Sequence, residues 1–300
     1  MLEAAAILLT LWLATNVFHR IWIAVRYRRW ERGGTRGADG LLQHGAAYTE
    51  GHGDIALLFV HGFADTPMLW KKLIAHLTQT RRFTCQAMRL PGAAEPLPST
   101  RRKTLTHWQA AVDAEVAALR ATHRAVWVIG HSMGGALAID VVQRATHPIH
   151  GLILLAPLIQ VSRARMPLIP PHIGFKLGQI LLALSPTFES YFTNIGTSPD
   201  DPTFQYVRDR FIPFATYRNM FALVASNAHL QNTLTLPVFA AVSGRDRVVD
   251  SDATLRWLTR YASAAKIEIF GDAGHVLPLK QNCHALADTL SEFIKDNTIS

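Results

Sequence analysis

The chain has 300 residues, of which 49% are hydrophobic and 17% are charged, and its formal net charge is +8. This length and apolar content allow one large buried core or two smaller ones, and so few charged residues exclude a disordered or coiled-coil protein. A basic chain invites a nucleic-acid partner, but no nucleic-acid-binding motif is present, so we expect none. Cys85 and Cys283 lie far apart without metal-ligand spacing and are expected to be buried thiols that form no disulfide.

Residues 1–25 are predicted to form a membrane anchor. The stretch from Ala4 to Val25 is apolar apart from a few polar residues, and it is long enough to cross a bilayer as a helix. Arg20 lies near one end, where its long side chain reaches the headgroups. Aromatic residues that suit the membrane interface lie at this end or just beyond it: Trp22, Tyr27 and Trp30.

Two other interpretations of this segment remain open, namely a cleaved signal peptide and a helix packed on the soluble domain. A signal peptide carries its positive charge before the apolar run, whereas here Glu3 precedes the run and the arginines follow it. Basic residues on the C-terminal side of a membrane helix predict that the bulk of the chain faces the cytoplasm. The arginines concerned are Arg20, Arg26, Arg28, Arg29, Arg32 and Arg36. A membrane is therefore the expected partner of this segment, and the sequence leaves the oligomeric state open.

A basic, glycine-rich stretch at residues 26–54 is predicted to be a linker with weak edge strands around Ala46–Tyr48. From residue 55 to residue 300, buried apolar runs alternate with helical patterns, which predicts an α/β domain with a mostly parallel, doubly wound sheet. We expect strands at Ile55–Val60, Phe83–Leu90, Val126–Ile129, Leu152–Ala156, Val238–Ser243 and Ile267–Phe270. We expect helices after Thr66-Pro67 and at Leu105–Ala121, Ala253–Tyr261 and Asn282–Lys295.

The interval at about residues 158–236 breaks this alternation. It holds several prolines between apolar helical patches such as Ile173–Leu184 and Phe221–Val224, and no strand is evident. We therefore predict a helical cap inserted over the carboxyl edge of the sheet, where sheets of this kind hold ligands. Its strongly apolar stretches favour an acyl chain over a polar acid or a sugar.

The apolar run Val126–Ile129 leads into the motif Gly-His-Ser-Met-Gly at residues 130–134, and small, helix-compatible residues follow. A strand, a sharp turn and a helix form the setting in which Gly-x-Ser-x-Gly presents a reactive hydroxyl. A Cβ at position 130 or 134 would collide with the neighbouring strand or helix. The helix directs its N-terminal N–H groups at the place where negative charge develops. Ser132 is therefore predicted to be a nucleophile.

Together these segments resemble the α/β-hydrolase superfamily and, within it, the bacterial carboxylesterase and monoacylglycerol lipase branch. The resemblance runs in the family's order from about residue 55 to residue 295 and implies the α/β-hydrolase fold. It departs from the family at Ala93-Ala94, where such proteins commonly have His-Gly. The matching segments are His61-Gly62-Phe63, Thr66-Pro67, Leu90-Pro91-Gly92, residues 130–135, residues 244–249 and Gly274-His275.

A serine hydroxyl is a poor nucleophile at neutral pH and needs a base within hydrogen-bond reach. His275 is the expected base, because it lies in a loop just after the last strand. Asp246 follows the strand Val238–Ser243 and is expected to orient the histidine and stabilise the imidazolium. The nearby carboxylates are given other roles, helix capping for Asp250 and Asp252 and a turn for Asp272.

The resemblance also implies an oxyanion hole formed by the backbone N–H groups of Phe63 and Met133. His61 and His131 are expected to support the loops from behind, and Asp65 is expected to be a loop or capping residue. Because serine hydrolysis requires neither, we expect no metal and no cofactor.

The leading functional hypothesis is a serine hydrolase that cleaves a small-molecule ester or lipid with an apolar acyl chain through an acyl-enzyme. A thioesterase, an acyltransferase and a carbon–carbon bond hydrolase use the same three groups and remain alternatives. A membrane-tethered binding protein without turnover is the alternative from another class, and the complete set of Ser132, Asp246 and His275 argues against it.

Overall fold

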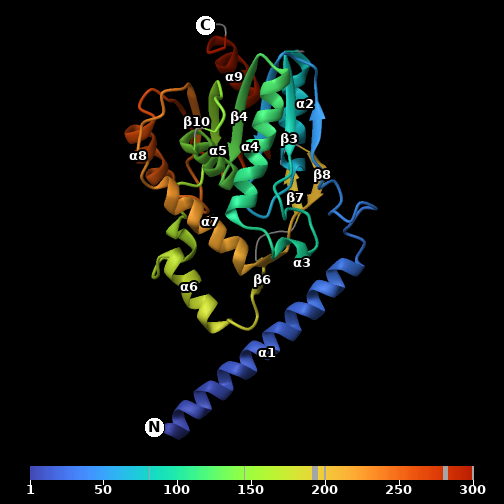
Figure 1. Cartoon of the computed structure of the whole chain (residues 1–300), viewed down its shortest axis with the longest axis vertical. Coiled ribbons are helices and arrows are strands. Elements are labelled where there is room, and N and C mark those ends of the chain that lie inside the picture. The colour runs from blue at the N-terminus through green and yellow to red at the C-terminus, as the bar shows by residue number, and fades with distance from the viewer. Residues whose placement is uncertain (81, 145, 191–194, 199–200, 280–282, 299–300) are drawn as a thin grey trace.

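The computed structural model describes the chain except for residues 81, 145, 191–194, 199–200, 280–282 and 299–300. A body of helices around a central sheet is extended by an insertion, and a long N-terminal helix projects away from it (Figure 1). The predicted α/β-hydrolase fold with an N-terminal apolar helix is confirmed. Cys85 and Cys283 are both buried thiols.

The central sheet has seven strands in the order β1-β3-β2-β4-β5-β10-β11. Strand β1 is antiparallel to β3, and every other pair is parallel. Strands β2, β4, β5 and β10 carry nearly continuous apolar side chains because helices cover both faces of a doubly wound sheet. Their bounds are Tyr48–Glu50 (β1), Ile55–Val60 (β2), Phe83–Met88 (β3), Ala125–His131 (β4), Gly151–Leu155 (β5), Val238–Ser243 (β10) and Lys266–Phe270 (β11).

Helices cover the sheet in two groups, with α2 packed against α9 and α5 packed against α4 and α7. Thr104 caps α4 in a capping box with His107, and Asp250 caps α8 by accepting a hydrogen bond from the Ala253 N–H. The bounds are Lys71–Leu77 (α2), Leu97–Thr100 (α3), Leu105–Thr122 (α4), Met133–Arg144 (α5), Ser251–Tyr261 (α8) and Cys283–Asp296 (α9). Short 3₁₀ helices lie at Pro67–Trp70, Thr78–Thr80, Arg163–Arg165 and Leu277–Leu279.

The predicted helical cap at residues 158–236 has its two helices, and it also contains short strands that were not evident in the sequence. Each strand pairs only with another strand of the insertion, β6 with β9 and β7 with β8. Strands β6, β7 and β9 have only three or four residues, too few for a clear alternation, and the proline near the start of β8 is typical of a break in a strand pattern. The elements are α6 (Pro171–Leu181), α7 (Phe214–Asn227), β6 (Thr187–Glu189), β7 (Ile195–Ser198), β8 (Asp201–Val207) and β9 (Phe211–Pro213).

Helix α1 runs from Leu2 to Arg32 and therefore extends beyond the predicted apolar stretch. Its polar residues are satisfied locally, because the Thr10 and Thr15 hydroxyls donate to carbonyls one turn earlier. Asn16 is fully buried and bridges to the insertion. Its amide donates to the Leu181 carbonyl at 2.9 Å and accepts from the Leu184 N–H at 2.9 Å. The helix thus has hydrogen-bonded contacts with the insertion beside the far end of α6.

The stretch that follows α1, predicted as a linker with weak edge strands, is held on the body by hydrogen bonds and leads into the edge strand β1. The Arg36 guanidinium pairs with Glu31 at the end of α1 and donates to the Ala94 carbonyl at 2.7 Å. Leu42 is buried, and its N–H donates to the same Ala94 carbonyl at 2.9 Å. The glycines of this stretch therefore lie in tight turns, where Gly34 and Gly40 adopt positive φ.

Candidate active site

Strand β4 and helix α5 meet at Ser132, whose φ of +54° lies in the left-handed region. Such a conformation is strained for a residue with a Cβ and is typical of a nucleophile elbow. An added Cβ on Gly130 would lie 2.3 Å from the Gly134 carbonyl oxygen, and one on Gly134 would lie 2.0 Å from the Val60 carbonyl oxygen. Both glycines are therefore required for strand, turn and helix to approach this closely.

A chain of hydrogen bonds joins the three residues that the sequence singled out. The Ser132 Oγ lies 2.9 Å from Nε2 of His275. On the other side of the ring, Nδ1 of His275 donates to Oδ2 of Asp246 at 2.8 Å. The second oxygen of Asp246 accepts from the N–H groups of Val248 and Val249 at 2.8 and 2.9 Å. This arrangement leaves Nε2 as the acceptor for the serine proton.

Asp246 is the only one of the four nearby aspartates that the structure brings to His275. Its carboxylate is fully buried. Burial acts to raise the pKa of Asp246, but the hydrogen bonds from His275 and the two backbone N–H groups outweigh it, so the pKa lies below its ordinary value. Asp250 caps α8, and Asp272 is an exposed partner of Arg245. Asp252 lies in the first turn of α8.

Two buried histidines support the loops of the site. Nε2 of His61 accepts a hydrogen bond from the Leu90 N–H at 3.1 Å. Nε2 of His131 donates to the backbone carbonyl of His275 at 2.9 Å and so fixes the loop that carries that residue. Burial lowers the pKa of both imidazoles. The pKa of His131 falls to about 3, and the charge of His275 adds a smaller effect in the same direction. Both side chains are therefore neutral imidazoles at physiological pH.

A cavity of about 250 Å³ opens beside Ser132 and His275. Phe63, Val248 and Val276 form apolar parts of its wall. The backbone N–H groups of Phe63 and Met133 find no hydrogen-bond acceptor in the part of the chain that the structure describes. They are thus available to an oxygen atom placed next to the serine.

A polar cluster that sequence patterns do not reveal lies on the wall of this cavity. Asp65 is buried and accepts hydrogen bonds from the Thr66 N–H and the Tyr206 hydroxyl, both at 2.9 Å. Arg208 lies 3.2 Å from the same carboxylate. Burial alone would lower the pKa of Arg208, but Asp65 raises it, and burial raises the pKa of the adjacent Asp209 to about 7. The sequence singles out only Asp65 of this cluster. Residues 206–209 belong to the insertion and carry no local motif that would mark them as part of the site.

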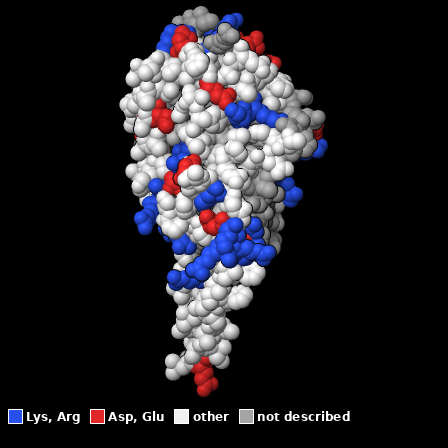
Figure 2. All heavy atoms as spheres, turned by 90° about the vertical axis from the view of Figure 1, so that its right-hand side faces the viewer, with Lys and Arg blue, Asp and Glu red and all other residues white. Residues whose placement is uncertain are grey.

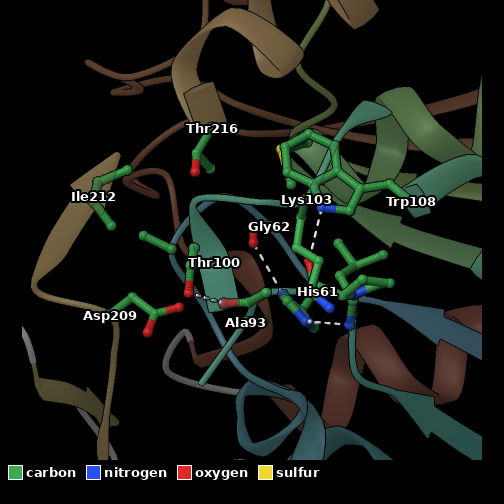
Figure 3. Close-up of a pocket in the computed structure, with 14 residues that line it drawn as sticks. His61, Gly62, Ala93, Thr100, Lys103, Trp108, Asp209, Ile212 and Thr216 are labelled. Carbon is green, nitrogen blue, oxygen red and sulfur yellow. Dashed lines mark hydrogen bonds between the residues drawn. The ribbon is translucent and has the colours of Figure 1, made fainter. Parts of the chain in front are cut away.

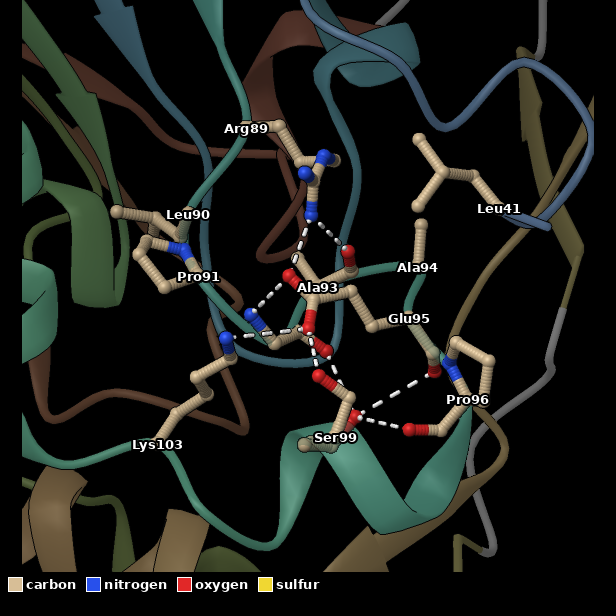
Figure 4. Close-up of polar contacts among 12 residues, drawn as sticks. Leu41, Arg89, Leu90, Pro91, Ala93, Ala94, Glu95, Pro96, Ser99 and Lys103 are labelled. Carbon is tan, nitrogen blue, oxygen red and sulfur yellow. Dashed lines mark hydrogen bonds and ion pairs between the residues drawn. The ribbon is translucent and has the colours of Figure 1, made fainter. Parts of the chain in front are cut away.

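The loop at Ala93-Ala94, where the chain departs from the family's pattern, is held by Glu95 (Figure 4). One carboxylate oxygen accepts from Arg89 at 2.8 Å and from the Gly92 N–H at 3.0 Å. The other oxygen pairs with Ser99 and Lys103. Burial acts to raise the pKa of Glu95, but these partners lower it to about 2. Ala94 has a φ of +60°, in the left-handed region that favours glycine, so an alanine is held there at a cost in strain.

A second hollow, of about 30 Å³, lies behind this loop (Figure 3). His61, Lys103 and Trp108 line one side, and Asp209 and Ile212 of the insertion line another. The hollow is too small for an acyl chain and has room only for water. Among the described residues, no group of three or more His, Cys, Asp or Glu side chains is arranged to hold a metal ion.

The model of the alpha/beta hydrolase family matches residues 57–289, and the chain belongs to this family. Its fold is similar to a structure reported for the two metagenome-derived lipolytic enzymes LipS and LipT, at 16% identity and a TM-score of 0.68 over 85% of this chain and 99% of that one. It is also similar to a soluble variant of monoglyceride lipase from Saccharomyces cerevisiae, at 16% identity and a TM-score of 0.69 over 85% and 91% of the two chains.

A third similar structure is the monoacylglycerol lipase of Paleococcus ferrophilus, at 17% identity and a TM-score of 0.64 over 84% and 98% of the two chains. A search of the curated proteins finds no match. At these identities the solved structures establish the shared fold, and the chemistry must be argued from the site itself.

Proposed function

We propose that the protein is a serine hydrolase that cleaves carboxylic esters of apolar acyl chains through an acyl-enzyme. The observation that carries this proposal is the hydrogen-bonded chain from Ser132 through His275 to Asp246 at the end of a strained elbow. A nucleophile, a base and a group that orients the base are the minimum set for acyl transfer.

In the first step, Oγ of Ser132 attacks the ester carbonyl carbon while Nε2 of His275 takes the hydroxyl proton. The negative oxygen that forms is stabilised by the N–H groups of Phe63 and Met133. The bond to the alkoxy oxygen then breaks, and His275 gives its proton to the departing alcohol. Water repeats the sequence on the acyl-enzyme, releasing the carboxylic acid and restoring the Ser132 hydroxyl. Asp246 holds the ring and offsets its positive charge throughout.

The substrate class follows from the walls and the surroundings of the cavity. Apolar side chains of Phe63, Val248 and Val276 border Ser132. Outside this cavity, the insertion exposes large apolar side chains along α6 and the loop before it: Leu168, Ile169, Ile173, Leu177, Ile180 and Leu181. An ester with an apolar acyl group fits the apolar part of the cavity wall better than a sugar or a polar acid ester, and the cluster around Asp65 forms the polar part.

Labelling by a fluorophosphonate tests the proposed nucleophile. We expect one labelled residue, Ser132, and expect Ser132→Ala to lower kcat on the order of 10⁶-fold while the thermal unfolding midpoint stays near that of the parent. Labelling that persists in Ser132→Ala would contradict the assignment. A substrate panel of oxygen esters and thioesters of equal acyl length then separates an esterase from a thioesterase.

We further propose that α1 crosses a membrane and that the domain from residue 55 onward lies on the cytoplasmic side, with the turn after α6, which Asn16 contacts, dipping into that face of the membrane. Along the described chain, α1 is the one helix long and apolar enough to cross a membrane, although signal sequences pass the same test. Only 6% of its most apolar window is buried, which disfavours a core helix of a soluble protein. The arginines that follow the apolar stretch support the orientation.

A further inference from the structure

A cavity of about 530 Å³ lies between the second half of α1, helix α3 and the turn from α6 to β6. It is separate from the cavity beside Ser132 and shares no lining residue with it. Three arginines line it, Arg20 and Arg28 from α1 and Arg101 next to α3. Apolar side chains form much of the remaining wall: Ile23, Ala24, Leu97 and Leu184.

No carboxylate of the described residues pairs with the positive charges in this cavity. The guanidinium groups of Arg20 and Arg28 meet no carboxylate within the described residues, and Arg101 donates to the Thr187 hydroxyl at 2.9 Å. Arg26, on the same helix, is by contrast paired with Glu189. Partial burial and then the charge of Arg20 lower the pKa of Arg101. Like charges gathered in one cavity repel one another unless an anion lies between them.

The position of the cavity along α1 indicates the source of that anion. From Leu2 to Arg20 a helix rises about 27 Å, which is close to the hydrocarbon thickness of a bilayer. When α1 spans the bilayer as proposed above, Arg20 therefore lies at the level of the lipid headgroups. Lys and Arg side chains gather in a band where the body meets the projecting helix, and the helix below the band carries no basic side chain (Figure 2).

We propose that this cavity binds the headgroup phosphate of an anionic phospholipid. Arg20, Arg28 and Arg101 bind the phosphate oxygens, and the apolar wall contacts the first methylene groups of the acyl chains. A basic pocket next to a membrane helix at the cytoplasmic surface is suited to this class of ligand. The inference rests on the membrane placement of α1 and does not depend on the chemistry at Ser132.

Titration of the full-length protein in neutral detergent micelles tests the site. We expect phosphatidylglycerol at tenfold excess over its Kd to raise the thermal unfolding midpoint by roughly 3 °C, and phosphatidylcholine to leave it unchanged. Arg20→Gln and Arg101→Gln should each weaken phosphatidylglycerol binding about fivefold. Arg29→Gln and Arg102→Gln remove the same charge from neighbouring exposed positions that do not line the cavity, and should keep the parent Kd within twofold.

Three results would overturn the proposal. Equal weakening by the control substitutions would mean diffuse surface attraction, and equal binding of phosphatidylcholine would mean that charge is not recognised. Saturation by inorganic phosphate at the same concentrations would mean a site for free phosphate instead of a lipid. Fluorophosphonate labelling of the same parent samples is read separately, so a failed hydrolase assignment and a failed lipid site are told apart.

Discussion

Asp246 is the carboxylate whose loss should cost most, because it alone contacts His275. Asp246→Asn keeps the shape but presents an amide, which favours the wrong histidine tautomer, and we expect kcat to fall on the order of 10⁴-fold. Asp250→Asn and Asp272→Asn alter a helix cap and an exposed ion pair, and should stay within about tenfold of the parent. Steady-state kinetics on a short ester give the ranking, and a reversed order would place the acid on another loop.

His131 should make the fold sensitive to mild acid. Its pKa is about 3 in the folded protein, against about 6.5 when unfolded, so below pH 6.5 the unfolded chain binds a proton that the folded chain does not. Stability therefore falls as the pH drops, by about 2 kcal/mol at pH 5 from this residue alone. The physical cause is that Nδ1 of His131 is buried with no acceptor among the described residues.

Thermal unfolding between pH 7.5 and pH 5 measures this effect. His131→Gln keeps a donor at the position of Nε2 for the His275 carbonyl but cannot be protonated, so its unfolding midpoint should depend less on pH than that of the parent. Identical pH profiles for parent and variant would show that His131 does not titrate differently in the two states.

At the scale of elements, the guanidinium of Arg36 joins three separate parts of the chain. Arg36 contacts Glu31 of α1, the Gly40 carbonyl and the loop at residues 94–95. That loop lies close to the candidate active site through Asp209, which accepts from the Ala94 N–H. Helix α1 is thereby fixed relative to the site at its C-terminal end, and Asn16 fixes it to the insertion nearer its middle.

Arg36→Ala should lower the stability of the full-length protein by about 3 kcal/mol, because it removes the guanidinium that pairs with Glu31 and bonds three backbone carbonyls. Arg36→Lys restores the charge but not the forked donors and should recover only part of the loss. Arg32→Ala is the matched control, since Arg32 is exposed, and should change stability by less than about 0.5 kcal/mol. Chemical unfolding in detergent supplies the values, and a parent-like Arg36→Ala would mean that the linker is not held.

For the whole molecule, the central expectation is that α1 holds the enzyme at a bilayer. Full-length protein should remain in the membrane pellet after a high-salt wash, because salt screens surface charge but does not extract a spanning helix. Recovery in the wash would leave only a peripheral contact.

A pair of substitutions within α1 tests directly whether this helix spans the bilayer. Leu9→Arg combined with Leu13→Arg places two charges on exposed positions of the apolar stretch and should raise the cost of insertion by roughly 5–7 kcal/mol. We expect this variant to leave the membrane fraction, and Leu9→Ala with Leu13→Ala to stay in it. Equal fractionation of the two variants would mean that α1 does not span the bilayer.

Local patterns in the sequence determined the sheet and the three candidate site residues. Ile55–Val60 is a run of apolar residues bounded by turn residues, and Gly130, Ser132 and Gly134 mark a turn whose geometry depends on their own backbone. His275 and Asp246 were found because each follows a strand, and the carboxyl ends of parallel strands lie at one edge of a sheet. Such strands and site residues can be identified from their neighbours in the sequence and from the topology of the fold.

What only the tertiary structure decided depends on contacts between distant segments. The strands β6 and β9 exist because they pair with each other, and Asp65 belongs to the site wall because Tyr206 and Arg208 of the insertion lie against it. The linker is ordered because Arg36 meets the Ala94 carbonyl, 58 residues further along the chain. A hydrogen bond or an ion pair of this length leaves no periodicity in the sequence, so its partners become visible only when the chain is folded.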